Sequence, residues 1–199
     1  ERVLVRRGDQ PVGLVRNPDH VIDVEQLGAT AVVIDLESCS VDDLAAHLQG
    51  AGAVVFAAGA GPGSGAARKE TVDRGAAVLL ADAAARAGVR RYLMVSAIGA
   101  DTRPEGRDEV FVAYLEAKAA ADAYVRGADL DWTIVRPGSL TNDAATGLVT
   151  AAEHVERSGI PRADVAGVVA AALDDPGTVG KQFEVVAGTT PIPDALEAL

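Results

Sequence analysis

The chain has 199 residues, a net charge of −11 at pH 7 and a sequence pI near 4.6. Hydrophobic residues make up 49% of it, but the longest apolar runs, such as residues 51–58, are far too short to span a bilayer. The acidic excess argues against direct binding of nucleic acid. A single cysteine, Cys39, excludes an internal disulfide, and the scattered histidines lack metal-ligand spacing. We therefore expect a soluble, cytoplasmic, metal-free protein that is a monomer or homodimer.

Short β-branched runs alternate with alanine-rich helical segments along the chain. In the first half this pattern predicts strands at 11–15, 31–35 and 53–58, and helices starting at 17–19 and covering 41–48 and 68–87. In the second half it predicts a strand at 91–96, a loop at 101–108, a helix at 110–126, a strand at 132–136, an irregular stretch at 139–160, a helix at 163–173 and a last strand at 182–186. This alternation indicates an α/β fold: a Rossmann-type, doubly wound parallel sheet forming a single domain over residues 1–199.

The N-terminus departs from the pattern of a dinucleotide-binding sheet. Such a sheet opens with a strand, a glycine turn and a helix that meets the pyrophosphate. Residues 2–5 read as a first strand, yet Arg6 follows at once and the next strand would form a hairpin. Three interpretations are open: a glycine-rich segment missing between Val5 and Arg6, a first helix of which residues 1–5 are the end, or a true deletion. We favour the missing segment.

A glycine-rich loop follows the strand at 53–58. Gly61, Gly63 and Ala66 match the spacing of a dinucleotide fingerprint, but Pro62 removes a backbone donor and no acidic residue ends a strand about twenty residues later. The segment is therefore interpreted as an ordinary loop after a central strand. Because ligands bind at the carboxyl ends of parallel strands, we expect the preceding residues Ala57, Ala58 and Gly59 to border a bound nicotinamide.

Two further strand ends carry candidate cofactor ligands. Arg16 follows the strand at 11–15, where a guanidinium binds an adenosine 2′-phosphate and favours NADP over NAD. The alternative is a solvated arginine. Asp35 and Leu36 end the next strand and are expected to border the adenine, although Asp35 also reads as an acidic residue at a helix start.

Tyr114 and Lys118 lie four residues apart and so share one face of the helix at 110–126. An ammonium there favours the phenolate and lowers the tyrosine pKa toward neutrality. Ser96 ends the preceding strand, where its hydroxyl is placed to hold a substrate carbonyl. Each residue alone also reads as an ordinary turn, interface or surface residue, but together they predict a proton-transfer site.

Residues 136–138 end the strand at 132–136 at the same edge of the sheet. Pro137 fixes the backbone and Gly138 permits close approach of a ligand. We therefore expect Arg136, Pro137 and Gly138 to shape the nicotinamide pocket.

These motifs together resemble the atypical short-chain dehydrogenase/reductase family, in its branch of small NAD(P)H-binding proteins related to NmrA-like regulators and biliverdin/flavin reductases. The resemblance covers nearly the whole chain and is carried by residues 14–18, 35–36, 95–99, 114–118, 130–138 and 161–166. It implies that Tyr114 is the catalytic acid/base, that Lys118 holds the nicotinamide ribose, that Ser96 positions the substrate carbonyl and that Arg16 selects NADP. The family's glycine fingerprint has no counterpart here, and the helix at 68–87 has no Asn to match a fourth catalytic residue.

The resemblance implies an NAD(P)H-dependent oxidoreductase, using NADP or NAD, that acts on a small carbonyl, quinone or flavin-like acceptor. The alternative is a non-catalytic NADP-binding redox sensor, because residues 139–160 leave little room for a substrate lobe. A weaker alternative is a sugar-nucleotide epimerase or dehydratase. Residues 101–108, residues 139–160 and the C-terminal segment are expected to form the substrate side.

Overall fold

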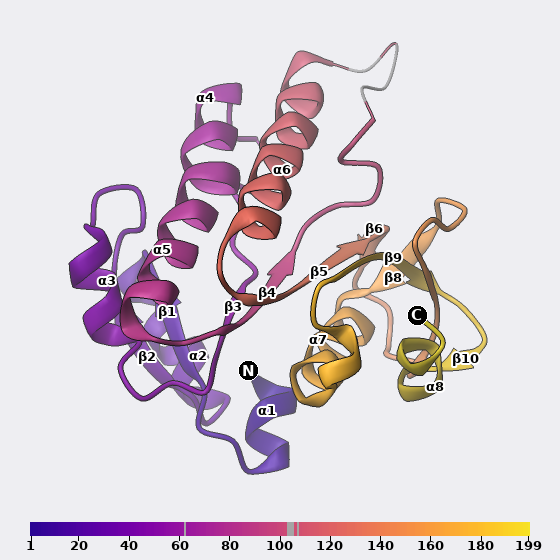
Figure 1. Cartoon of the computed structure of the whole chain (residues 1–199), viewed down its shortest axis with the longest axis horizontal. Helices are drawn as coiled ribbons and strands as arrows, with labels where there is room; N and C mark the ends of the chain where they lie inside the picture. Colours follow the sequence, from indigo (N-terminus) through magenta and orange to yellow (C-terminus); the bar gives the residue numbers. More distant parts are fainter. Residues whose placement is uncertain (62, 103–105, 107) are drawn as a thin grey trace. The chain divides into compact units, whose positions relative to one another are not determined.

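The computed structural model of the chain describes residues 1–61, 63–102, 106 and 108–199 (Figure 1). These residues form two compact units, an N-terminal unit (Glu1–Cys39) and a C-terminal unit (Ser40–Leu199). Each unit is described separately below. No helix in the described ranges is both long and apolar enough to cross a membrane.

The N-terminal unit is built on a short parallel pair of strands. Its elements are α1 (Arg2–Arg7), β1 (Val12–Val15), the 3-10 turn η1 (Pro18–His20), α2 (Val21–Gln26) and β2 (Thr30–Val33). Strands β1 and β2 pair in parallel from Val12↔Thr30 to Val15↔Val33. The helix start expected at 17–19 is confirmed, since the Asn17 side chain accepts a hydrogen bond from the Asp19 amide at 3.1 Å.

The first residues are helical, so the reading of residues 2–5 as a strand is wrong. Helix α1 runs through Val5 and Arg6 without interruption and ends at Gly8. This geometry agrees with the interpretation of residues 1–5 as the end of a helix. Because residues 2–7 are helical, they do not form the hairpin with β1 that motivated a missing segment between Val5 and Arg6. That segment itself stays a prediction.

The C-terminal unit contains a mixed, mainly parallel six-stranded sheet. Its order is β10 (Thr190–Pro191), β7 (Leu148–Ala152), β9 (Lys181–Ala187), β5 (Asp131–Pro137), β4 (Arg91–Val95) and β3 (Ala53–Phe56). Strands β3, β4, β5 and β9 are parallel, whereas β7 pairs antiparallel with both of its neighbours, β9 and β10. The Rossmann-type α/β class is confirmed, with an antiparallel edge that the sequence pattern did not predict.

The stretch expected to be irregular, 139–160, contains strands. Besides β7 it includes β6 (Ser139–Thr141) and most of β8 (Gly159–Pro161), which pair with each other in parallel. The strand at 182–186 is not the last, because β10 follows it. The loop expected at 101–108 falls largely on residues 103–105 and 107, which lie outside the described residues.

Helices cover both faces of this sheet (Figure 1). Helices α5 (Ala77–Ala87) and α6 (Glu109–Gly127) lie on one face, and α7 (Arg162–Asp174) lies on the other with α8 (Ile192–Glu197) nearby. The remaining helical elements are α3 (Val41–His47), α4 (Ala66–Arg68), the π-helical segment η2 (Lys69–Ala76) and the 3-10 turn η3 (Pro176–Thr178). Helix α3 confirms the helix expected at 41–48, and Ser40 and Asp43 form a capping box at its start.

Alternate residues of the strands build the two cores. Leu93, Val135, Phe183 and Val185 are buried in one apolar cluster with residues of α7 and α8. On the opposite face Tyr92 is fully buried, and its hydroxyl donates to the Ala77 carbonyl of α5 at 3.0 Å. This alternation directs the even-numbered residues of β5 toward α6.

The helix expected at 68–87 changes its winding along its length. Residues 69–76 form π-helical turns before α5 begins at Ala77. The buried residues of η2 are Lys69, Val72, Asp73 and Ala76, and η2 packs along α6. Two charged side chains, Lys69 and Asp73, therefore lie on the face of η2 that is buried.

Candidate active site

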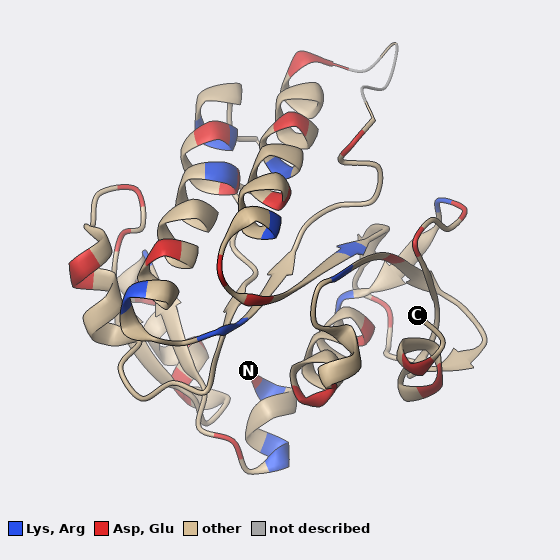
Figure 2. Ribbon diagram, in the orientation of Figure 1, with Lys and Arg blue, Asp and Glu red and all other residues tan. Residues whose placement is uncertain are grey.

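The candidate site lies in the C-terminal unit, where β3 and β4 end beside η2 and α6. Residues of both charge signs occur along these helices (Figure 2). Tyr114 is half-buried on α6, and Lys118 is 3% exposed one turn further along. The structure therefore places the expected Tyr–Lys pair on a helix that faces other protein groups.

Lys118 is held by groups from three elements. Its Nζ donates to the Val95 carbonyl at the end of β4 at 3.2 Å and lies 3.6 Å from Asp73 Oδ1. The same ammonium lies 5.4 Å from the centroid of the Phe56 ring, at the end of β3. Asp73, at 1% exposure, supplies the negative charge that a buried lysine needs.

Lys69 contacts Tyr114, and Asp73 contacts Lys118, one turn apart along η2 and α6. The Lys69 ammonium lies 5.4 Å from the centroid of the Tyr114 ring, one turn away from the ion pair of Asp73 with Lys118. Both residues of η2 also hold the loop after β3. Lys69 Nζ donates to the Gly61 carbonyl at 3.0 Å, and Asp73 Oδ2 accepts from the Ala60 amide at 3.2 Å.

The sequence analysis did not assign Lys69 or Asp73 to the site. Their spacing of four residues, matched to the Tyr114–Lys118 spacing on the neighbouring helix, is the signal that would have found them. Asp73 contacts Lys118 from the helix in which no Asn was found. A carboxylate therefore contacts the lysine that this site was expected to use.

The pKa of Tyr114 is raised to about 12, chiefly because burial penalises the phenolate. The carboxylates of Asp73 and Asp122 raise it further. The expectation that Lys118 brings the tyrosine pKa toward neutrality is therefore wrong. Burial also lowers the pKa of Lys118, opposed by Asp73 and Asp122. The sequence spacing showed the lysine but neither the burial nor the two carboxylates.

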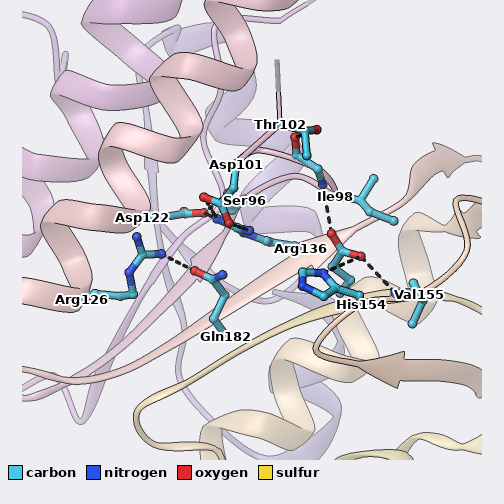
Figure 3. A network of polar contacts seen from close by, with 12 residues as sticks. Ser96, Ile98, Asp101, Thr102, Asp122, Arg126, Arg136, His154, Val155 and Gln182 are labelled. Atoms are coloured by element: carbon cyan, nitrogen blue, oxygen red, sulfur yellow. Dashed lines mark hydrogen bonds and ion pairs between the residues drawn. The ribbon is translucent and has the colours of Figure 1, made fainter. Parts of the chain in front are cut away.

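Ser96 directly follows β4, which ends at Val95, and its hydroxyl is engaged by the protein. Ser96 is 4% exposed, and its Oγ donates to Asp122 Oδ2 at 2.8 Å (Figure 3). Asp122 lies one turn beyond Lys118 on α6 and is fully buried. Ser96 is thus oriented toward α6, and its expected contact with a substrate carbonyl stays a prediction.

Arg136 connects Asp122 to Asp101. It donates to Asp122 Oδ2 from Nε at 2.9 Å and from Nη2 at 2.7 Å, and to Asp101 Oδ1 from Nη2 at 2.9 Å, while Nη1 contacts Asp101 Oδ2 (Figure 3). Burial raises the pKa of Asp122, opposed by Arg136, Ser96 and Lys118. The hydrogen bond from Arg136 lowers the pKa of Asp101. The guanidinium is 2% exposed and fixes the start of the 101–108 segment.

Gly138 follows β5 at a point of close backbone approach. A Cβ atom there would lie 2.2 Å from the Ser158 carbonyl oxygen. The space that this glycine leaves is therefore filled by the chain itself, which explains the glycine without a ligand. The cofactor contacts expected of Arg136, Pro137 and Gly138 stay predictions, and for Arg136 and Gly138 the structure shows packing roles.

Glu184 links the loop after β4 to the segment after β7, on the expected substrate side. Its Oε1 accepts from the Gly99 amide and its Oε2 from the Val155 amide, both at 3.1 Å (Figure 3). Glu184 is buried, and it lies opposite Arg136 in the β5–β9 register. The segment after Ser96 is thus fixed by buried charged side chains from two strands.

Ala57, Ala58 and Gly59 are exposed where β3 ends, as a surface for a flat ligand ring requires. A Cβ atom at Gly59 would lie 3.1 Å from Asp73 Oδ1. Within the described residues that oxygen accepts no hydrogen bond, although it is buried. It faces the Lys118 ammonium at 3.6 Å and is closed to solvent. The small, exposed residues at the end of β3 therefore fit the flat ring of the cofactor.

The candidate ligands in the N-terminal unit have protein partners of their own. Arg16 Nη1 forms an ion pair with Glu37 Oε2 at 2.9 Å, and its side chain is 54% exposed. Asp35 Oδ1 accepts from the Glu37 amide at 3.0 Å, and Leu36 is half-buried. Asp35 thus caps a turn rather than a helix, and the adenine contacts stay predictions.

The fold and the strand-end residues define a Rossmann-type nucleotide-binding protein. A family model described as NAD(P)H-binding matches residues 1–176, and the chain belongs to this family. The resemblance to the atypical short-chain dehydrogenase/reductases is thereby confirmed.

Relatives match over nearly the full chain. "Uncharacterized sugar epimerase YhfK" of Bacillus subtilis is 40% identical over 186 residues, which are 94% of this chain and 86% of the relative. The solved structure of a "Putative NAD-dependent epimerase/dehydratase" from Bacillus halodurans is 38% identical with a TM-score of 0.90, covering 98% of this chain and 91% of that one. The oxidoreductase ylbE from Lactococcus lactis is 30% identical with a TM-score of 0.83, covering 98% and 88%.

Proposed function

We propose that the protein is an NAD(P)H-dependent oxidoreductase that reduces a small carbonyl, quinone or flavin-like acceptor, with Tyr114 as the proton donor. The observation that carries this proposal is the half-buried Tyr114 one turn from Lys118 on α6, with the Lys118 ammonium held at the ends of β3 and β4. The name of the Lactococcus relative, an oxidoreductase, supports the same class of reaction.

The protonation state of Tyr114 suits reduction. With a pKa of about 12 the side chain is a phenol at neutral pH. Ionising it at pH 7 would cost about 7 kcal/mol, at about 1.36 kcal/mol per pKa unit. It is therefore a poor resting base but a competent acid. In a carbonyl reduction the phenol gives its proton to the oxygen of the acceptor, because a developing alkoxide is a stronger base than a phenolate.

Bound NAD(P)H supplies the hydride that reaches the acceptor carbon. The residues of this chain supply the proton that the reduced acceptor needs. Tyr114 donates its hydroxyl proton and becomes a phenolate, while Lys118 holds the nicotinamide ribose. Asp73 fixes Lys118 against the Val95 carbonyl. Solvent returns the proton to the phenolate after product leaves, which completes the balance.

We propose NADP as the preferred cofactor, selected by Arg16. Its guanidinium is exposed enough to meet a phosphate. Glu37 competes for the same guanidinium and repels a phosphate, so the preference over NAD is expected to be moderate rather than absolute. Removing that competitor with Glu37→Gln should strengthen NADP binding.

The direct test of the function is Tyr114→Phe. Loss of a general acid is expected to lower kcat by about 100-fold or more, while the Kd for NADPH, followed by fluorescence, changes less than about twofold. Tyr124→Phe is the matched control, because Tyr124 lies on the same helix and its hydroxyl donates to Asp82 instead. Full turnover in Tyr114→Phe would remove Tyr114 from the mechanism.

A non-catalytic NADP-binding sensor is the second candidate. It is favoured by one observation: the Ser96 hydroxyl and the Lys118 ammonium are both buried and engaged by protein partners. Tight NADPH binding without consumption across carbonyl, quinone and flavin acceptors would support the sensor and contradict the reductase. The names of two relatives keep an epimerase as a third candidate, which predicts sugar-nucleotide interconversion without net consumption of NAD(P)H.

A further inference from the structure

Lys69 is a buried cation that the proposed reaction does not use. It is 8% exposed and opens the π-helical segment η2 on the face that is buried. Its ammonium donates to the Gly61 carbonyl at 3.0 Å and lies over the Tyr114 ring at 5.4 Å. Across the described ranges, no carboxylate forms an ion pair with it.

The contrast with Lys118 makes this arrangement informative. Lys118 is similarly buried, but Asp73 lies 3.6 Å from its ammonium. Asp73 is four residues from Lys69 on the same segment, yet it pairs with Lys118 and with the Ala60 amide. Taking an ammonium out of water costs several kcal/mol unless an anion or several hydrogen bonds compensate it. A carbonyl and a ring face leave Lys69 with donor capacity to spare.

The position of the Lys69 ammonium indicates which anion would pair with it. It lies against the ring that carries the proposed proton donor, so an anion bound to Lys69 would lie next to the reacting group. We propose that Lys69 binds an anionic group, such as a carboxylate, of the acceptor and thereby selects anionic acceptors. This inference rests on the proposed reductase function.

The cofactor is the other source of an anion, because its phosphates carry the same chemistry. The two sources are separated by measuring acceptor and cofactor binding independently. We therefore suggest a pair of acceptors that differ in charge and by a single methyl group, 4-carboxybenzaldehyde and its methyl ester, together with the Kd for NADPH.

In Lys69→Met, which keeps the length of the apolar stem, KM for 4-carboxybenzaldehyde is expected to rise about ten- to hundredfold relative to KM for the ester, as for loss of a charged hydrogen bond. Lys69→Arg should restore most of this ratio. Lys181→Met is the matched control, because the Lys181 ammonium also donates to a backbone carbonyl, that of Leu199, at 2.7 Å. It should leave the ratio unchanged.

An equal rise of KM for both acceptors would overturn the proposal and leave Lys69 as a tether for the loop after β3. A weakened Kd for NADPH with an unchanged acceptor ratio would also overturn it, since the anion would then belong to the cofactor. Circular dichroism and the melting temperature confirm that each variant is folded. If Lys69→Met does not fold, Lys69→Gln gives the test, because it keeps a hydrogen-bond donor but removes the charge and should still reduce the preference for the acid over the ester.

A second readout does not depend on turnover. Ligand-observed NMR with benzoate and methyl benzoate measures binding to the NADP-loaded protein. Selective binding of benzoate that is lost in Lys69→Met would support the anion site even if neither aldehyde is reduced, in which case only the proposed function fails. Absence of benzoate binding to the wild-type protein would overturn the anion site.

Discussion

Replacing Arg136 with Met should remove a large part of the stability of the protein. Arg136 is 2% exposed and donates twice to Asp122, which is fully buried, and also to Asp101, which is 51% exposed. The contact with the exposed partner is worth about 0–1 kcal/mol. The loss of the buried partner leaves an uncompensated carboxylate, which costs about 3–5 kcal/mol. Against a typical total of about 5–15 kcal/mol, this change is severe.

The pH dependence of that loss has a definite sign. Burial already raises the pKa of Asp122 above its ordinary value, and removing Arg136 raises it further. A carboxyl with a raised pKa in the folded state stabilises the fold below its unfolded pKa, and this contribution is lost as pH rises through the folded value. Asp101 has the opposite shift, so wild type loses its contribution as pH falls. The Asp122 effect makes the stability gap between wild type and Arg136→Met shrink from pH 7 toward pH 4, and the Asp101 effect shrinks it further below about pH 4.

Urea denaturation of wild type, Arg136→Met, Asp122→Asn and the double variant measures this gap. The double variant should be more stable than Arg136→Met alone, because it no longer buries an unpaired charge. A loss below about 1 kcal/mol in Arg136→Met, or a gap that widens on acidification, would refute the reasoning.

Three further changes test separate parts of the structure. Gly138→Ala should lower the free energy of unfolding by about 1–3 kcal/mol, because its Cβ would lie 2.2 Å from the Ser158 oxygen. Gly127→Ala is the control, since Gly127 has open space around it and should tolerate the change. Equal urea midpoints for the two variants would contradict this. Arg16→Ala should weaken NADP binding by about 1.5–3 kcal/mol more than NAD binding in titration calorimetry, and equal losses would exclude 2′-phosphate recognition. The phenolate absorbance that distinguishes wild type from Tyr114→Phe should not appear below about pH 10, since burial and two carboxylates raise the pKa to about 12; a transition near pH 8 would contradict that cause.

Much of the fold follows from local patterns in the sequence. The strands β3, β4, β5 and β9 contain apolar, aromatic or β-branched runs long enough to recognise, and the Ser40 cap marks the start of α3. Strands β6 and β8 are three residues each, too short to carry a periodic signal, so residues 139–160 read as irregular. The π-helical winding of η2 also escaped prediction, because the same residue types suit α- and π-helical turns.

The site was predictable in its members on α6 but not in its electrostatics. The spacing of Tyr114 and Lys118 fixes that they share a helix face. It does not show that the charges of Asp73 and Asp122 also raise the pKa of the phenol, since Asp73 comes from a separate segment. In the same way, Arg136 reads as a strand-end ligand until its contact with Asp122 is seen. Burial depends on which elements pack together, and that is decided by residues far apart in the chain.

The winding of η2 lets this helix change its length by one residue without losing the face it turns toward α6. A π-helical turn holds one more residue than an α-helical one. Deleting one residue between Lys69 and Asp73 would therefore let the turn close as an α-helical turn, in which residues three apart still share a face. Relatives that are shorter by one residue at 70–72 would keep both the Lys69 ammonium and the carboxylate that pairs with Lys118 on this side of the helix.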